Sequence, residues 1–100
     1  MEKLGLWVML TVKAGKETEL AAFLESAVPL VEAEPGTISW YALQIGPSTF
    51  GIFDTFADDT GREAHLSGKV AAALMAKAPD LLAEAPSIKK IDLLAVKGAK

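Results

Sequence analysis

The sequence predicts a single α+β domain of the ferredoxin-like type, spanning residues 1–100, with a four-stranded antiparallel sheet and its helices on one face. A length of 100 residues suits one domain. Apolar periodicities of strands and helices alternate in the order strand, helix, strand, strand, helix, strand. Right-handed crossovers applied to this βαββαβ order bring both helices to the same face of the sheet.

The first predicted strand covers residues 4–12. Its even-numbered positions form one apolar face, made of Leu6, Val8, Leu10 and Val12. The opposite face carries Trp7 and Met9, so the pattern indicates a central strand that is covered on both sides. The apolar run before Lys13 is too short to span a bilayer.

The first helix is expected from about Glu17 to Val31. Glu17 and Glu19 stand in its first turn, where the helix dipole favours acidic side chains. Apolar residues recur at helical spacing, namely Leu20, Phe23, Leu24, Ala27, Val28 and Val31. Pro29 predicts a kink inside this helix, and Pro35-Gly36 ends it.

Residues 37–45 and 49–56 are predicted to form an antiparallel hairpin around the turn Gly46-Pro47-Ser48. In the first of these strands Trp40 and Tyr41 point to opposite faces.

A second helix is expected to begin near residues 58–60, where Asp58, Asp59 and Thr60 are candidate N-caps and Thr60 with Glu63 has capping-box spacing. It should break at Ser67-Gly68, resume over residues 69–77 and give way to a short turn that begins at Pro79. The last predicted strand covers residues 88–96 and alternates apolar and charged residues, which is typical of an edge strand.

The composition predicts an oligomer. Apolar residues make up 51% of the chain and the mean hydropathy is +0.30, which is high for a small monomer with a modest core. The surplus suggests a subunit interface or an apolar ligand cavity. Because no segment remains to cover the second face of the sheet, we expect a homodimer that packs through that face.

Charge and residue types exclude several classes of function. A net charge of −3 argues against nucleic acid as a partner. The chain has no cysteine and one histidine, so we expect no disulfide, no metal site and a cytoplasmic location. No phosphate-binding loop, dinucleotide fingerprint or serine-nucleophile elbow is present, so we expect no bound cofactor.

His65 is the first candidate for chemistry, because it alone has an unperturbed pKa near neutrality. Arg62 and Lys69 stand three residues before and four after it, on one helical face, where they could stabilise an oxyanion. The alternative is a half-exposed histidine that bonds a backbone carbonyl. Asp54 could orient a helix residue, or be a solvated carboxylate.

Aromatic residues cluster on the predicted strands: Trp7, Trp40, Tyr41, Phe50, Phe53 and Phe56. They could line a pocket for a flat aromatic ligand. The alternative is that they only build the core and a subunit interface.

The chain resembles the antibiotic biosynthesis monooxygenase family, the quinol monooxygenase-like proteins of the dimeric α/β-barrel superfamily. The resemblance rests on Ala33-Glu34-Pro35-Gly36 after the first helix, on Tyr41, and on Asp54-Thr55-Phe56 followed by His65-Leu66-Ser67. Phe56 stands where family members often have tryptophan, and His65 stands at the place of the family histidine. The asparagine that related haem-degrading proteins carry on the first strand is absent, with Val8 near its place, which argues against haem cleavage.

The resemblance implies a dimer with face-to-face sheets and a pocket between each sheet and its own helices. It also implies cofactor-independent oxygen insertion into a small phenol or quinol, with His65 as acid/base or hydrogen-bond donor and Arg62 as electrostatic helper. Phe56, Val8, Tyr41 and Trp40 are then the candidates for contacting the substrate. The alternative function is a non-catalytic dimer that binds a small apolar ligand.

Overall fold

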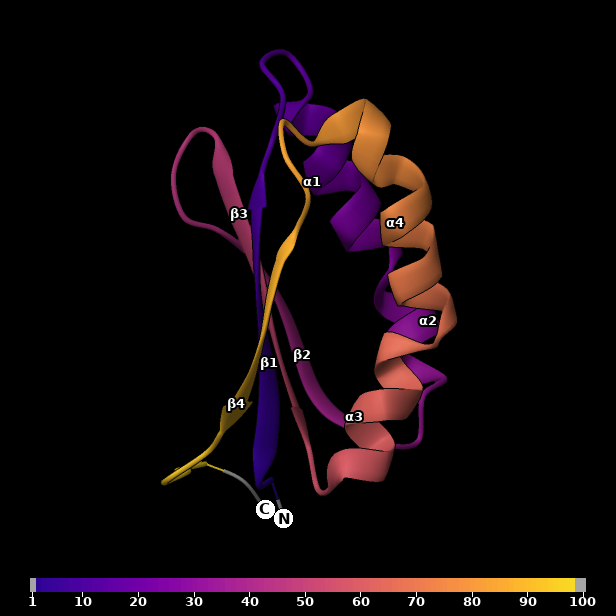
Figure 1. Ribbon diagram of the computed structural model, residues 1–100, viewed down its shortest axis with the longest axis vertical. Coiled ribbons are helices and arrows are strands. Elements are labelled where there is room, and N and C mark those ends of the chain that lie inside the picture. The colour runs from indigo at the N-terminus through magenta and orange to yellow at the C-terminus, as the bar shows by residue number, and fades with distance from the viewer. Residues whose placement is uncertain (1, 99–100) are drawn as a thin grey trace.

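The computed structural model describes residues 2–98 and has two layers, a sheet and a layer of helices (Figure 1). The elements in chain order are β1 (Leu4–Thr11), α1 (Glu17–Ser26), α2 (Val28–Glu32), β2 (Thr37–Gln44), β3 (Thr49–Phe56), α3 (Asp59–Leu66), α4 (Lys69–Leu81) and β4 (Ser87–Asp92). The four strands pair antiparallel in the order β2-β3-β1-β4. All helices lie on one side of this sheet, which confirms the predicted α+β ferredoxin-like fold.

Strand β1 lies inside the sheet, between β3 and β4, as its two apolar faces predicted. Its even-numbered residues face the helices, where Leu6, Val8, Leu10 and Val12 are buried. The register places Val8 beside Ile52 of β3, which is also buried. Leucines of the helices complete this core, namely Leu20, Leu24, Leu74 and Leu81. Each such side chain contributes roughly 1.5–3 kcal/mol by leaving water.

The first helical segment is interrupted at Ala27, so that α1 and α2 are separate helices. The prediction of a kink is thus confirmed, but the break precedes Pro29, which is the second residue of α2. Proline has no N–H to donate and its ring clashes with the carbonyl four residues earlier. The helical hydrogen bonds of α1 therefore cannot continue through Pro29. The N–H groups of Leu30 and Val31 both bond the carbonyl of Ala27 instead.

The second helical segment begins at one of the predicted N-caps and differs from prediction at Pro79. Asp58 is the N-cap of α3 and its Oδ1 accepts from the N–H of Gly61 at 3.0 Å, so the Thr60–Glu63 capping box is not used. Helix α4 continues through Pro79 to Leu81, whereas a separate turn was predicted there. The proline lies in the last turn, where it removes a single hydrogen bond, and Leu82 N still bonds Ala78 O at 2.9 Å.

Strand β4 ends at Asp92, four residues before its predicted end. The reason is the position of its partner strand, because β1 begins at Leu4 and Leu4 pairs with Asp92. One further bond, from Leu93 N to Lys3 O, closes the ladder. Beyond it Leu94 is 98% exposed.

The second face of the sheet carries no helix in the described structure (Figure 1). Cross-strand pairs place Trp7 and Tyr41 beside Phe53 on this face. The rings of Tyr41 and Phe53 stack, with centroids 6.4 Å apart and planes 13° apart. We call this the open face, and its larger apolar side chains are Trp7, Met9, Tyr41, Leu43, Phe53 and Ile91.

Within residues 2–98, none of the helices has the length and apolar character needed to cross a membrane.

Candidate active site

His65 is held between two carboxylates from different parts of the chain. It lies near the end of α3 and is 7% exposed. Its Nδ1 lies 2.6 Å from Oε1 of Glu34, and its Nε2 lies 2.9 Å from Oδ2 of Asp54. Both ring nitrogens therefore have an acidic partner. The predicted alternative, a half-exposed histidine bonded to a backbone carbonyl, does not describe this arrangement.

Asp54 is the deepest member of this cluster, with no exposed surface. It lies on β3 on the helix-facing side, between its cross-strand neighbours Leu6 and Trp40. Neither of its oxygens has a well-aligned hydrogen bond to a described residue, so its contact with His65 is best described as a close ion pair. A buried carboxylate without compensation is very costly, so the imidazolium of His65 is what stabilises it there.

Glu34 lies between α2 and β2 and is fixed by local contacts. Thr37 Oγ1 donates to Glu34 Oε1 at 2.7 Å, and this is the same oxygen that contacts His65. Two glycines let the α2–β2 connection approach α3 closely, because a Cβ on Gly36 would lie 2.8 Å from the Cα of Gly61. This approach places Glu34 within reach of His65.

The two carboxylates raise the pKa of His65 above 6.5. Burial acts in the opposite direction and is the largest single influence, because it disfavours the charged imidazolium. The close polar contacts with Asp54 and Glu34, together with the negative charges of the two carboxylates, outweigh that effect. The net effect favours the imidazolium form of His65 more in the folded protein than in the unfolded chain.

Phe56 shields one side of the histidine. It is fully buried, and the two ring centroids lie 5.5 Å apart with planes tilted by 44°. The phenyl ring excludes water from His65, which strengthens the interaction of His65 with its carboxylates.

A cavity of about 340 Å³ opens beside this cluster, and we call it the His65 cavity. Its polar lining consists of Glu34, Thr37, His65 and Lys69, and its apolar wall includes Leu30, Ala33, Pro35 and Ala64. The volume falls in the range of small-molecule sites, about 300–1,000 Å³. The cavity is formed by the α2–β2 connection and the α3–α4 junction, and the sheet contributes only Thr37, the first residue of β2. The resemblance had implied a pocket between the sheet and the helices.

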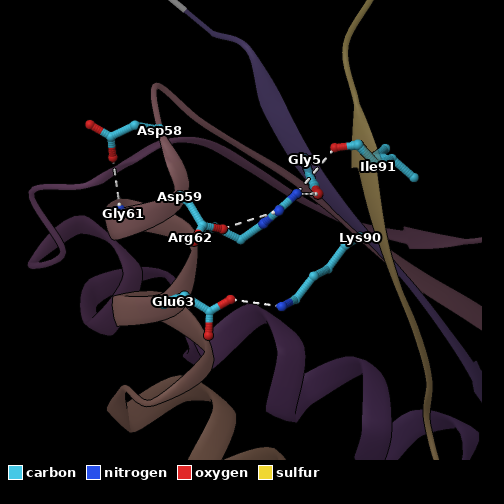
Figure 2. A network of polar contacts seen from close by, with 8 residues as sticks. All are labelled: Gly5, Asp58, Asp59, Gly61, Arg62, Glu63, Lys90 and Ile91. Atoms are coloured by element: carbon cyan, nitrogen blue, oxygen red, sulfur yellow. Dashed lines mark hydrogen bonds and ion pairs between the residues drawn. The ribbon is translucent and has the colours of Figure 1, made fainter.

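Arg62 points toward the sheet and away from this cavity (Figure 2). Its Nη1 donates to the carbonyls of Gly5 and Ile91, at 3.4 and 3.3 Å, and its Nη2 contacts Asp59 at 3.2 Å. A second link, from Lys90 Nζ to Glu63 at 2.8 Å, joins the same helix to β4. These contacts attach α3 to the edge of the sheet. Of the two predicted basic neighbours of His65, Lys69 is the one that lines the cavity.

The remaining four candidates lie in four different environments. Phe56 contacts His65, as described, while Val8 is part of the main core. Trp40 is half-buried and lines a second cavity of about 380 Å³ beside α2, with its Nε1 lacking a partner among the described residues. Tyr41 is on the open face, 54% exposed, on the other side of the sheet from His65.

Sequence reasoning named Asp54 as a residue that could orient a helix residue, and its contact with His65 of α3 agrees with that reading. It did not select Glu34, although both acids stand in the segments that carried the family resemblance. No local feature of the sequence separates these two acids from the other carboxylates of the chain. Residues 2–98 contain no group of three or more histidine or acidic residues that could hold a metal ion.

Comparison with known proteins supports the fold and identifies a relative. No protein-family profile and no curated protein matches the chain. A solved protein of unknown function from Nitrosomonas europaea is 57% identical, with a TM-score of 0.97 over 100% of this chain and 97% of that one. Two structures named "putative antibiotic biosynthesis monooxygenase" share the fold at 18% identity. The one from Nitrosomonas europaea has a TM-score of 0.84 and covers 96% of this chain and 94% of its own. The one from Caulobacter crescentus has a TM-score of 0.81, with 94% and 92% covered.

These likenesses confirm the fold that the resemblance implied. The chain belongs to the same family as the first Nitrosomonas europaea protein, and its fold is that of the antibiotic biosynthesis monooxygenase-like structures.

Proposed function

We propose that this protein is a monooxygenase that oxidises a small phenol or quinol in the His65 cavity without a cofactor. The observation that supports this most is a buried histidine with a carboxylate at each ring nitrogen, in the wall of a cavity of about 340 Å³. In the overall reaction one oxygen atom of O₂ enters the substrate. The other leaves as water with two hydrogens that the substrate supplies, so the substrate is the reductant.

The residues of the cavity suit the first step, which is ionisation of the substrate hydroxyl. The apolar wall excludes water from the bound ring, which strengthens electrostatic interactions inside the cavity. His65 and Lys69 bring positive charge to the place where the phenolate forms. The cluster of two carboxylates and one imidazolium carries a net charge of −1, so it can accept the proton that the hydroxyl loses.

The second candidate function is binding of a small aromatic ligand without chemistry. The observation in its favour is that both nitrogens of His65 already have carboxylate partners, so neither is free to exchange a proton with a ligand. The same cavity would then select ligands by shape and by the Glu34 carboxylate.

Oxygen uptake with a panel of quinols, compared with anaerobic incubation, distinguishes the two functions. We expect uptake that survives dialysis against a chelator and falls about 10²–10⁴-fold in His65→Ala, the usual contribution of a group that assists proton transfer. Glu32→Gln is the matched control, because Glu32 is exposed and does not line the His65 cavity. Binding of quinols without oxygen uptake would favour the ligand-binding function, and a stoichiometric flavin or metal ion in the purified protein would contradict the cofactor-independent mechanism.

We also propose that two chains pair through the open face of the sheet. Its apolar side chains include Tyr41 at 54% and Leu43 at 38% exposure, and no described element of the same chain covers them. Contiguous apolar surface of this kind is typical of subunit interfaces. The two edge strands bear polar side chains on this face, Ser39 of β2 and Lys89 of β4, which suit the rim of an interface.

Sedimentation at micromolar concentration tests the dimer. The expected species has twice the chain mass of 10.5 kDa, and Tyr41→Asp should convert it to a monomer by burying a charge at the interface. Met75→Asp is the control, because Met75 on α4 is equally exposed but lies on the helical side. A wild-type protein that sediments only as a monomer would rule out this interface.

A further inference from the structure

We infer that Glu34 is the base that takes the proton from the substrate hydroxyl, and that Asp54 is a positioning residue that keeps His65 in its imidazolium form. This assignment rests on the proposed function, because it concerns the same cavity. It differs from the sequence-based expectation, in which His65 itself is the acid/base group.

The partners of His65 make it a poor proton acceptor. A neutral imidazole has one N–H donor and one lone pair, so a neutral His65 would turn a lone pair toward one of its two carboxylates. If that carboxylate were Asp54, a fully buried charge would be left without any donor among the described residues. The imidazolium donates from both nitrogens and so satisfies both carboxylates, and it has no lone pair with which to accept a further proton.

The two oxygens of Glu34 have different surroundings. Oε1 contacts both His65 Nδ1 and Thr37 Oγ1, so both of its lone pairs already have a hydrogen-bond partner. Oε2 has no hydrogen bond within residues 2–98, and it lies next to Gly68, where a Cβ would come within 3.0 Å of it. Because Glu34 and Gly68 both line the cavity, Oε2 is the carboxylate oxygen placed to meet a ligand there.

The proton transfer is then simple. The O–H bond of the bound phenol breaks, its electron pair stays on the phenolate oxygen, and the proton bonds to Oε2 of Glu34. His65 keeps both of its protons and orients Glu34 through Oε1. The cluster changes from a net charge of −1 to neutral, so the new phenolate does not face a net negative cluster, and Lys69 at the cavity adds positive charge.

The state of His65 can be observed directly, since it is the only histidine. In ¹⁵N NMR at neutral pH we expect both ring nitrogens to carry protons in the wild type. In Asp54→Asn, the pKa of His65 should be lower than in the wild type, because one of its two carboxylate partners is lost. A neutral His65 in the wild type at pH 7 would overturn the assignment, and so would an unchanged titration in Asp54→Asn.

Chemical rescue tests the role of Glu34. Turnover by Glu34→Ala should fall about 10²–10⁴-fold. Added formate should raise the turnover of Glu34→Ala at least tenfold, because formate can occupy the place of the missing carboxylate. Formate should not rescue His65→Ala, and Glu32→Ala should behave as wild type because Glu32 lies outside the cavity.

Ligand binding without oxygen separates this inference from the proposed function. Under anaerobic conditions we expect the quinol to bind wild type and Glu34→Ala with dissociation constants within about tenfold of each other. If the wild type binds no quinol, the proposed function fails. If quinol binds and is oxidised, but Glu34→Ala keeps full turnover or shows no rescue by formate, the base is not Glu34 and only the inference fails. Glu34→Gln, with its melting temperature, serves as the second variant if Glu34→Ala does not fold.

Discussion

Asp54 and His65 form a buried ion pair between the sheet and α3, with 2.9 Å between Oδ2 and Nε2. Asp54 is wholly buried on β3 and His65 is 7% exposed, so each is the reason why the other can be charged inside the protein. The pair joins the two layers of the fold at the point where the His65 cavity opens. Stability and the protonation of the candidate site are therefore coupled.

Removing the charge of Asp54 should destabilise the fold. In Asp54→Asn the buried imidazolium loses one of its two counter-ions, and breaking a buried ion pair typically costs on the order of 3 kcal/mol. Urea unfolding measures this loss. Asp80→Asn is the control, since Asp80 is exposed on α4 and should change stability by less than about 0.5 kcal/mol. Equal effects of the two substitutions would show that the ion pair does not contribute to stability.

The pH dependence of stability should carry the signature of His65. Its pKa in the folded protein is raised above the unfolded value of 6.5, because Asp54 and Glu34 together outweigh the effect of burial. The folded state therefore binds the proton more tightly than the unfolded state. This stabilisation is fully present below about pH 6.5 and is lost as pH rises through the folded pKa.

Melting temperatures measured from about pH 6 to pH 9 check this prediction. The groups that face His65 are Asp54 from β3 and Glu34 from the α2–β2 connection, with Lys69 of α4 also at the cavity. In His65→Gln the decline toward high pH should be smaller than in the wild type. A wild-type curve that rises from pH 6.5 to pH 8 would contradict the direction of the pKa shift.

The contact between Gly36 and Gly61 should tolerate no side chain. A Cβ on Gly61 would lie 2.7 Å from the carbonyl oxygen of Gly36, which is backbone and cannot move aside cheaply. Gly61→Ala should therefore cost about 1–3 kcal/mol and displace Glu34 from His65. Gly46→Ala is the control, because its Cβ would meet nothing within 4 Å. Thermal melting together with the NMR titration of His65 measures both consequences.

The N-terminus of α3 should depend on Asp58 and not on Thr60. Asp58 accepts a hydrogen bond from Gly61 N at 3.0 Å, so Asp58→Ala should lower the unfolding free energy by about 1 kcal/mol. Thr60→Ala should cost less, because no hydrogen bond of the Thr60 side chain occurs in the described structure. If Thr60→Ala lowered the unfolding free energy more than Asp58→Ala in urea unfolding, the helix would instead be capped by the Thr60–Glu63 capping box.

Arg62 should matter for stability through its links to the sheet. Arg62→Met keeps the length of the side chain but removes donors to the carbonyls of Gly5 and Ile91, which should cost roughly 1–3 kcal/mol. Lys77→Met is the control, as Lys77 is exposed on α4, on the helical side, and has no ion-pair partner among the described residues. Turnover of the same variant, corrected for the folded fraction, tests the catalytic role that the family resemblance suggested for Arg62.

Prediction from sequence succeeded where local pattern alone decides the outcome. Alternating apolar residues fixed the faces of β1, and the turn residues after Ile45 placed the β2–β3 hairpin correctly. Helix and strand ends were less predictable, because they depend on partners distant in the chain. The end of β4 is set by where β1 begins, and the passage of α4 through Pro79 is possible because the proline falls in the last turn.

The candidate site was predictable only in part. A lone histidine with Arg62 and Lys69 at helical spacing pointed to His65, and the family resemblance agreed. Arg62 and Lys69 had seemed equivalent because they flank His65 on one helical face. The break at Ser67-Gly68 and the direction of the α3 side chains separate them, so that Arg62 bonds the sheet and Lys69 lines the cavity.

The sequence by itself determined the fold class, the two apolar faces of the central strand and the identity of the single histidine, because periodicity and composition are local properties of the chain. Only the tertiary structure decided that Glu34 and Asp54, which lie 31 and 11 residues before His65 in the sequence, contact its two ring nitrogens. Carboxylates are common on protein surfaces, and nothing local distinguishes these two from the others. What distinguishes them is the burial created when α3 packs on β3 and when Gly36 meets Gly61.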